Sequence, residues 1–170
     1  MKSKSPAFAL LLGAALALAA SCVGREIDSP LPSRRLLDVG AGTGLLACTP
    51  LSADSSTQVI GPDGGTLQVG PHVLVIPAGA LDSSVVITAL APSDSVNRVQ
   101  FSPAGLTFQQ PATLTMSYAN CGVAGWLLPR QIAYTSDLLQ VLEYLGGRDD
   151  VIAQTVSAPV HHFSDYVVAW

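Results

Sequence analysis

The chain has 170 residues, of which only 12% are charged, and its formal net charge at pH 7 is −4. Charged residues make up about 25% of an average soluble protein, so this chain is sparsely charged. An acidic chain without a basic patch is not suited to bind nucleic acid, and we exclude that class of function. The abundance of Val, Thr, Ser, Leu, Ala, Gly and Pro is typical of an extracytoplasmic β-protein rather than a helical bundle.

Residues 1–21 have the pattern of a bacterial export signal. Lys2 and Lys4 provide a positively charged start, and the apolar run Ala7–Ala20 then leads to a small residue and Cys22. The run has 14 residues, whereas a membrane-spanning helix needs about 20. We therefore expect a signal peptide and a mature chain outside the cytoplasm. Its removal takes away both lysines and leaves six arginines against twelve acidic residues, a net charge of −6.

Cys22 indicates how the exported chain is held. The stretch Leu18–Cys22 resembles a lipobox, in which the cysteine is lipidated and becomes the new N-terminus. Val23 follows, and the absence of aspartate at this position favours the outer membrane over the inner membrane. The alternative is ordinary signal-peptidase cleavage after Ala17–Ala19 or Ala19–Ser21, which would give a periplasmic or secreted protein.

The three cysteines make an odd number, which would leave a free thiol in an exported protein. Lipidation of Cys22 would leave Cys48 and Cys121 as a pair, and an oxidising compartment favours a disulfide between them. The alternative is two buried free cysteines. No cluster of histidine or acidic residues surrounds either one in the sequence, so we expect no metal site.

Residues 22–56 show no sustained hydrophobic period and contain Pro30, Pro32 and Pro50. We interpret them as a tether or flexible linker. Within this segment, Leu36–Leu46 resembles the glycine-rich loop of an S-adenosylmethionine methyltransferase. Such a loop needs a following helix and a parallel sheet, whereas Pro50 comes almost at once, so we expect no cofactor.

Residues 57–170 contain short apolar or alternating runs separated by turn residues. This pattern predicts one all-β domain, an antiparallel β-sandwich of short strands or the related barrel. One stretch, Ser136–Leu145, is ambiguous because its leucines also have helical spacing, and we favour a strand from Gln140 onward. The expected strands are Gln58–Ile60, Thr66–Val69, His72–Ile76, Val85–Leu90, Arg98–Phe101, Ala112–Tyr118, Gln131–Thr135, Gln140–Leu145, Val151–Val156 and Tyr166–Trp170.

Two spaced signatures resemble the ZU-five domain, named after zona occludens and uncoordinated-five proteins. The first is formed by Gly64–Leu67 and Val73–Leu81, in which Ala78 replaces the second proline of the family's Ile-Pro-Pro-Gly-Ala-Leu. The second is formed by Phe101–Phe108 and the strand Leu114–Tyr118. The resemblance implies a β-sandwich that binds other proteins or domains and is not an enzyme. The better-known members are intracellular, so their partners are not carried over.

The motif His162-Phe163-Ser164 resembles the site at which some ZU-five scaffold proteins undergo autoproteolysis, between Phe and Ser. In an extended chain His162 and Ser164 share a face, so His162 could take the hydroxyl proton while Ser164 attacks the carbonyl of Phe163. The alternative is structural, with Phe163 in the core, Asp165 in a bend and Tyr166–Trp170 as the last strand. Cleavage also needs a strained peptide bond, which a sequence does not reveal.

The remaining polar and aromatic residues do not define a site. Asp149 and Asp150 follow a glycine turn and are interpreted as solvated acids rather than calcium ligands. Trp126 and Trp170 are too few to define a carbohydrate platform, although they leave glycan binding open. The sequence predicts a non-enzymatic cell-envelope module, held to the membrane by an N-terminal lipid, with a structural or protein-binding role. Self-cleavage and glycan binding are the alternatives.

Overall fold

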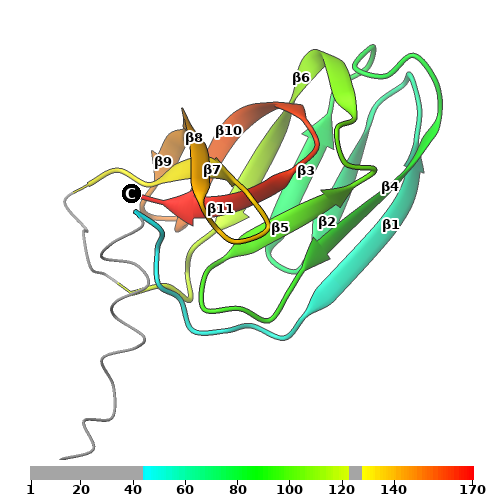
Figure 1. Ribbon diagram of the computed structural model, residues 1–170. Helices are drawn as coiled ribbons and strands as arrows, with labels where there is room; N and C mark the ends of the chain where they lie inside the picture. Colours follow the sequence, from blue (N-terminus) through cyan, green and yellow to red (C-terminus); the bar gives the residue numbers. More distant parts are fainter. Residues whose placement is uncertain (1–43, 123–127) are drawn as a thin grey trace, which may run out of the picture. The chain divides into compact units, whose positions relative to one another are not determined.

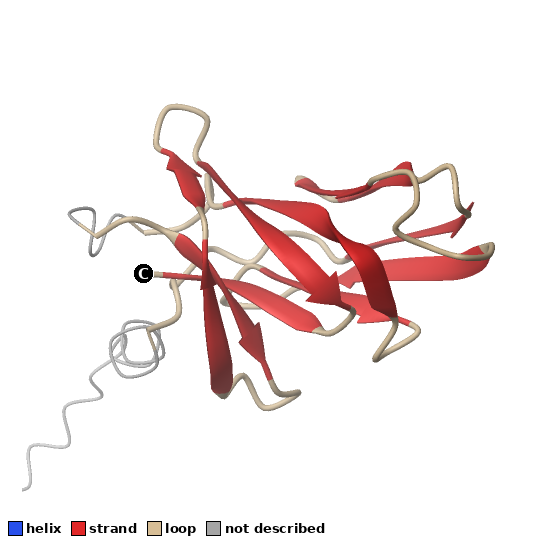
Figure 2. Ribbon diagram, turned by 90° about the horizontal axis from the view of Figure 1, so that it is seen from above, coloured by secondary structure: helices blue, strands red, loops and turns tan. Residues whose placement is uncertain are grey.

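The computed structural model describes residues 44–122 and 128–170, which form two β-sheets packed on each other (Figure 1). One sheet has six strands in the order β1-β4-β5-β11-β7-β8, and the other has five in the order β2-β3-β6-β10-β9. All pairings between these strands are antiparallel, and Figure 2 shows the two layers from a second direction. The antiparallel β-sandwich expected from the sequence is thus confirmed. The strands are β1 (Asp54–Ile60), β2 (Gly65–Val69), β3 (His72–Ile76), β4 (Val85–Ala91), β5 (Arg98–Ser102), β6 (Thr107–Ser117), β7 (Gln131–Thr135), β8 (Val141–Gly146), β9 (Arg148–Asp150), β10 (Thr155–His162) and β11 (Asp165–Ala169).

The core between the sheets follows from the alternation of apolar residues along the strands. In β6, Ala112, Leu114 and Met116 are completely buried, whereas Thr113 between them is exposed. Leu74 of β3 lies opposite Leu114 in the register and is buried with it. Successive side chains of a strand point to opposite faces, so each sheet presents one apolar face to the other.

The last strand, β11, is buried on both of its faces. Tyr166 and Val168 belong to the core between the sheets, whereas Val167 and Ala169 belong to a second, smaller apolar cluster. That cluster includes Leu45, which is 0% exposed. Because neighbouring residues of a strand face opposite ways, the second cluster lies on the outer face of the six-stranded sheet. A strand buried on both faces belongs in the interior of its sheet, and β11 is fourth of six.

The turn between β1 and β2 requires a glycine. Gly64 has φ +74°, and its N–H donates to the carbonyl of Gly61 at 3.0 Å. A Cβ at Gly64 would collide with the carbonyl oxygen of Ile76. Glycine adopts such a positive φ without the steric cost that a side chain would bring. The N–H of Gly79 donates to Pro62 at 2.7 Å, which joins this turn to the one that follows β3.

The expected strand Val151–Val156 is wrong in its first four residues, because the chain turns there. The carboxylate of Asp150 accepts hydrogen bonds from the N–H groups of Ile152, at 3.1 Å, and Ala153, at 2.9 Å. Gln154 then takes a positive φ of 52°, and β10 starts directly after it. The β-branched residues suggested a strand, but the aspartate fixes a turn in front of it.

The helical alternative for residues 136–145 is also wrong. The N–H of Leu139 donates to Ser136 at 2.9 Å, and the N–H of Ser136 donates to Gln140 at 3.0 Å. Leu139 takes a positive φ of 59°, which a helix does not allow. The hairpin returns at once into β8, as the preference for a strand from Gln140 onward predicted.

The folded domain starts earlier than the boundary expected at residue 57. Leu45 and Leu46 are fully buried, Cys48 is buried too, and β1 already begins at Asp54. At least residues 44–56 of the expected tether therefore belong to the domain. The end of the methyltransferase-like stretch forms a β-bridge between Leu45 and Ala169, so it does not lead into a helix.

Burial of His72 predicts that the domain loses stability in acid. The N–H of Ser117 donates to Nδ1 of His72 at 3.2 Å, and burial lowers the pKa of His72 to about 4. The unfolded chain, with an ordinary histidine pKa near 6.5, binds a proton that the folded chain excludes. The free energy of unfolding should therefore be highest above pH 6.5. It should fall by about 3 kcal/mol as the pH drops from 6.5 through 4.

Urea unfolding at pH 7 and pH 4 measures this effect. His72→Gln should remove about 3 kcal/mol of the pH dependence, whereas His162→Gln, at a partly exposed histidine, should retain it. Equal pH dependence in the wild type and His72→Gln would contradict the assignment.

Candidate functional site

The chain enters the described domain through residues 44–48, here called the lead-in segment, which pairs with the end of β11. The N–H of Leu46 donates to the carbonyl of Val168 at 3.0 Å, and the N–H of Trp170 donates to Gly44 at 3.1 Å. These bonds extend the six-stranded sheet beside β11. The first described residues and the last are therefore held together at one end of the sandwich.

A disulfide between Cys48 and Cys121 fastens the lead-in segment, as the sequence predicted. Backbone bonds lie on either side of it: the N–H of Cys48 donates to Ser95 at 2.8 Å, and the N–H of Gly122 donates to Ala47 at 2.9 Å. The cross-linked residues are 73 apart in the sequence. Closing a loop of that length in the unfolded chain stabilises the fold by about 4 kcal/mol in the chain-entropy account. A structural disulfide is typical of an oxidising, exported compartment.

A pair of asparagines strengthens the same junction. The side-chain amide of Asn97 donates to Oδ1 of Asn120 at 2.7 Å, and the amide of Asn120 donates back at 3.0 Å. The amide of Asn97 also donates to the carbonyl of Ser117, and that of Asn120 to the carbonyl of Thr49. No local pattern in the sequence marks this pair, because its two members are 23 residues apart.

A groove of about 380 Å³ opens next to this end of the sandwich. A volume above about 300 Å³ is within the range of small-molecule sites. Trp170 supplies an aromatic side chain that is partly buried against the core, and Gln131 supplies polar atoms. The groove is lined by Leu128, Pro129, Arg130, Gln131, Gly146, Gly147 and Trp170.

A network behind the groove holds Arg130 and β9 in place. The hydroxyl of Tyr118 donates to Asp149 at 2.6 Å, and the backbone N–H of Arg130 donates to the same carboxylate at 2.9 Å. The guanidinium carbon of Arg130 lies 5.7 Å from the centre of the Tyr118 ring. Burial, and then the Asp149 carboxylate, raises the pKa of Tyr118 to about 12. Asp149 and Asp150, expected to be solvated acids, are instead structural acceptors here.

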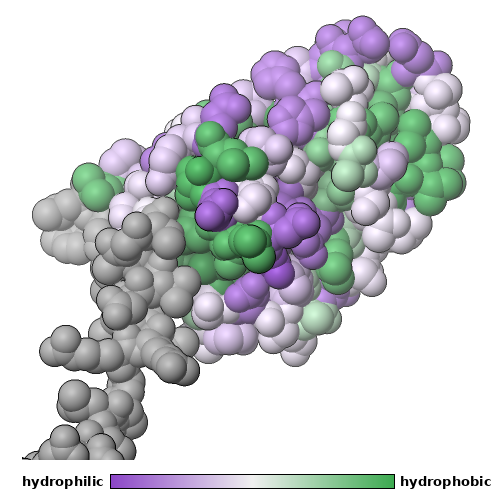
Figure 3. Space-filling model, viewed as in Figure 1, coloured by the Kyte–Doolittle hydropathy of each residue, from purple (hydrophilic) through white to green (hydrophobic). Residues whose placement is uncertain are grey.

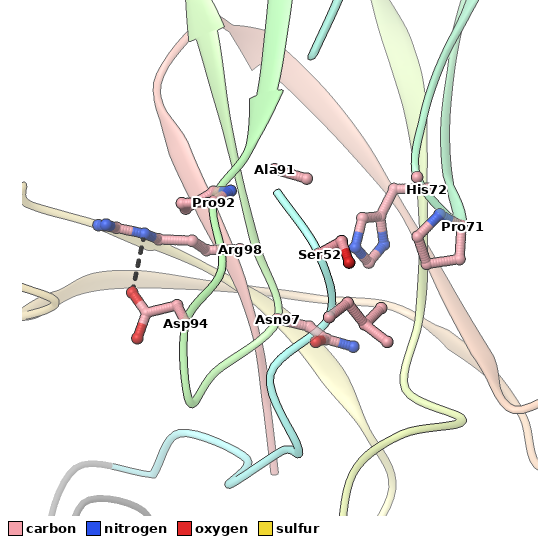
Figure 4. A pocket seen from close by; sticks show the side chains of 10 residues that line it. Ser52, Pro71, His72, Ala91, Pro92, Asp94, Asn97 and Arg98 are labelled. Atoms are coloured by element: carbon pink, nitrogen blue, oxygen red, sulfur yellow. Dashed lines mark ion pairs between the residues drawn. The ribbon is translucent and has the colours of Figure 1, made fainter. Parts of the chain in front are cut away.

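A second cavity, of about 20 Å³, lies beside the buried His72 (Figure 4). Ser52 and Asn97 also line it, and the ion pair between Arg98 Nε and Asp94, at 3.3 Å, lies further along its wall. Such a volume is large enough for about one water molecule. We therefore assign it no ligand.

Phe163 of the suspected cleavage motif is a core residue. It is 2% exposed, and its ring stacks on Phe101 with 5.0 Å between the ring centres and meets Phe108 edge-on at 5.1 Å. Its N–H donates to Leu106 at 2.7 Å, and its carbonyl accepts the N–H of Gly105 at 3.1 Å. That N–H would stabilise negative charge on the carbonyl oxygen during an attack.

The groups needed to start that attack are not joined. The ring of His162 lies edge-on to Tyr134, with 5.2 Å between the ring centres, and the Tyr166 hydroxyl donates to the His162 carbonyl. No hydrogen bond links the imidazole to Ser164 in the part of the chain that the structure describes. β10 ends at His162, so the strand alternation that would place the two side chains together does not continue through the motif.

Metal-ligating clusters and membrane-spanning helices are considered next for residues 44–122 and 128–170. Within them, no group of three or more His, Cys, Asp or Glu residues could hold a metal ion. These residues also contain no helix long and apolar enough to cross a membrane. The signal peptide 1–21, the lipidation candidate Cys22 and Trp126 lie outside the described residues.

Comparison with known proteins adds no assignment. No protein-family model matches the chain, and no curated protein matches it significantly. The ZU-five resemblance therefore depends on its two sequence signatures alone. In the structure, the first runs from the β1–β2 turn through β3 to Leu81, and the second runs from β5 into β6.

The motif at Phe163 and Ser164 should stay intact, because His162 does not engage the Ser164 hydroxyl. We expect the intact mass of the purified mature protein to show one full-length species, unchanged after prolonged incubation at neutral pH. Ser164→Ala serves as the matched non-cleavable control. A fragment shortened by residues 164–170 in the wild type, absent from Ser164→Ala, would establish self-cleavage instead.

Proposed function

We propose that this chain is exported, is held at the cell envelope by a lipid on Cys22 and acts there as a non-enzymatic structural or protein-binding module. The observation that carries the proposal is the reinforced junction at residues 44–48. A domain attached to a membrane through its N-terminus receives any pulling force at that point. This chain places its disulfide, its asparagine pair and its pairing with β11 there.

The order of these contacts along the chain suits such an anchor. A force on the N-terminal side first meets the bonds of Gly44 and Leu46 with the end of β11. It then reaches Cys48, where the covalent bond to Cys121 carries it across the sandwich. The strands after Cys48, starting with β1, are protected from being peeled off the sheet one by one.

The chain between the proposed lipid and the domain sets how far the module can reach. Residues 23–43 separate Cys22 from the lead-in segment, and a chain of that length can span at most about 70 Å. The module could therefore contact partners on the membrane surface or a short distance above it. Its partners are proposed to be envelope proteins, with envelope glycans as the alternative.

Anchoring is tested by replacing Cys22. We expect the wild type to take up an alkyne-bearing fatty acid in cells and to sediment with membranes, and Cys22→Ser to be unlabelled and soluble. Ser21→Ala is the matched control, because it keeps a small residue next to the cysteine. An unlabelled wild type, or a Cys22→Ser variant that still sediments with membranes, would contradict the lipid anchor.

Glycan binding is a second candidate because the groove combines an aromatic ring with polar groups. Trp170 lines it beside Gln131 and two glycines, whose backbone is accessible without side chains. A sugar ring could stack on the indole while its hydroxyls bond to the amide.

Calorimetric titration with soluble peptidoglycan fragments tests this candidate. Loss of the stacking partner in Trp170→Ala should weaken binding by about tenfold. Leu142→Ala, at an exposed residue of β8 outside the groove lining, should bind like the wild type. Equal affinities for all three proteins, or no binding by the wild type, would exclude the groove as a site for these glycans.

A further inference from the structure

The four edges of the two sheets are not equally protected against pairing with another strand. β9 has only three residues, and β8 is interrupted by two register shifts and carries Glu143. β2 has five residues. β1 is the longest of the four, with seven residues in unbroken register with β4. It contains no lysine, proline or bulge, the features that normally prevent an edge strand from pairing.

The outer face of this edge is apolar at one end. Val59 is 63% exposed and Val86, its register partner on β4, is 61% exposed. Figure 3 shows apolar residues gathered over this end of β1 and β4, at the right of the view. Figure 1 shows β1 as the outermost strand of its sheet.

The residues next along the same face are small and uncharged. Thr57 lies opposite Thr88, and their hydroxyl oxygens are 2.9 Å apart. Ser55 lies opposite Leu90, which is partly exposed. Asp54 is the only charged residue of β1, and its carboxylate already accepts the N–H of Gly70 at 2.6 Å.

We propose that β1 pairs antiparallel with β1 of a second copy of this chain, about a two-fold axis at Thr57. The pairing joins the two six-stranded sheets into one continuous sheet. A second copy suits this edge because β1 is complementary to itself in that register. Thr57 faces Thr57 of the second copy, which extends the pair with Thr88 into a row of four hydroxyls across both copies. Val59 faces Ser55 of the second copy, with the exposed Leu90 of that copy beside it.

Charge is compatible with this register and sets its salt dependence. Asp54 faces Ile60 of the second copy, so no like charges lie directly opposite each other. Over the described residues, however, three arginines stand against nine acidic residues, and the two copies repel at longer range. Added salt should therefore tighten the dimer rather than weaken it.

The interface is small, because one seven-residue strand adds little buried area compared with a stable dimer. Association in solution should consequently be weak and reversible. If the lipid anchor proposed above holds, two copies confined to one membrane would meet at a higher effective concentration. The pairing itself does not need the anchor, so the test is made without it.

Cysteine cross-linking tests the register directly. The background is the full chain with Cys22→Ser, exported, purified and kept concentrated under mild oxidation. Thr57→Cys places two thiols face to face on the axis, where a disulfide can form. In Val59→Cys the two thiols are offset by four residues, about 13 Å along the strands, which is too far for a disulfide. Mixing Val59→Cys with Ser55→Cys brings facing thiols together again.

We expect Thr57→Cys to run as a disulfide-linked dimer on a non-reducing gel, and the dimer fraction to rise with salt before oxidation. Val59→Cys should stay monomeric, although its thiol is exposed, and should cross-link only with Ser55→Cys. Cross-linking of Thr57→Cys no faster than that of Val59→Cys would overturn the proposal. A Thr57→Cys thiol that neither cross-links nor reacts with a maleimide would also overturn it, because another segment would then cover β1.

Discussion

The fold depends on the pairing of the lead-in segment with the end of β11. β11, the last strand that the structure describes, is buried on both faces. On the inner side it contributes Tyr166 and Val168 to the main core, and on the outer side Val167 and Ala169 belong to the same apolar cluster as Leu45. Burying a Val or Leu side chain stabilises by about 1.5–3 kcal/mol, so losing the lead-in segment would expose apolar area that the sheet alone does not cover. The disulfide therefore stabilises the lead-in segment, which contributes Leu46 to the main core and Leu45 to the second apolar cluster.

The sequence predicted the sandwich and most of its strands because alternation is a local signal. β3 and β7 have the expected bounds, and seven other strands differ from the expected ones by up to five residues at their ends. β9 was not expected, and β10 shares only Thr155 and Val156 with the strand expected there. The failures have long-range or side-chain causes. Val151 and Ile152 have high strand propensity, but the Asp150 carboxylate holds their backbone in a turn. Leu45 and Leu46 follow a glycine-rich segment that has no hydrophobic periodicity. They join the sheet only through backbone pairing with β11, which lies more than a hundred residues later in the sequence.

The chemistry of the site was harder to predict than the fold. The disulfide could be predicted because cysteines are few and an exported compartment favours their pairing. The asparagine pair and the role of Asp149 could not, because amides and carboxylates are common and only the tertiary fold shows which of them meet. The motif at Phe163 shows the opposite problem. Its three residues match a pattern of self-cleavage. In the structure, however, Phe163 packs against Phe101 and Phe108 in the core, and β10 ends at His162, so strand alternation does not bring the His162 and Ser164 side chains together.

The proposed attachment and the proposed self-association involve different parts of the six-stranded sheet. The lead-in segment joins the sheet at β11, and β1 lies three strands away at the edge, a separation of about 14 Å at the usual strand spacing. β4 and β5, between them, are held to both neighbours by antiparallel ladders. A strand added at β1 would therefore leave the bonds of Leu46 and Cys48 unchanged, and the end proposed to carry the anchor would lie outside the dimer interface. Because each copy has one such edge, pairing at β1 would end at two copies instead of continuing into a fibre, as a closed two-fold contact requires.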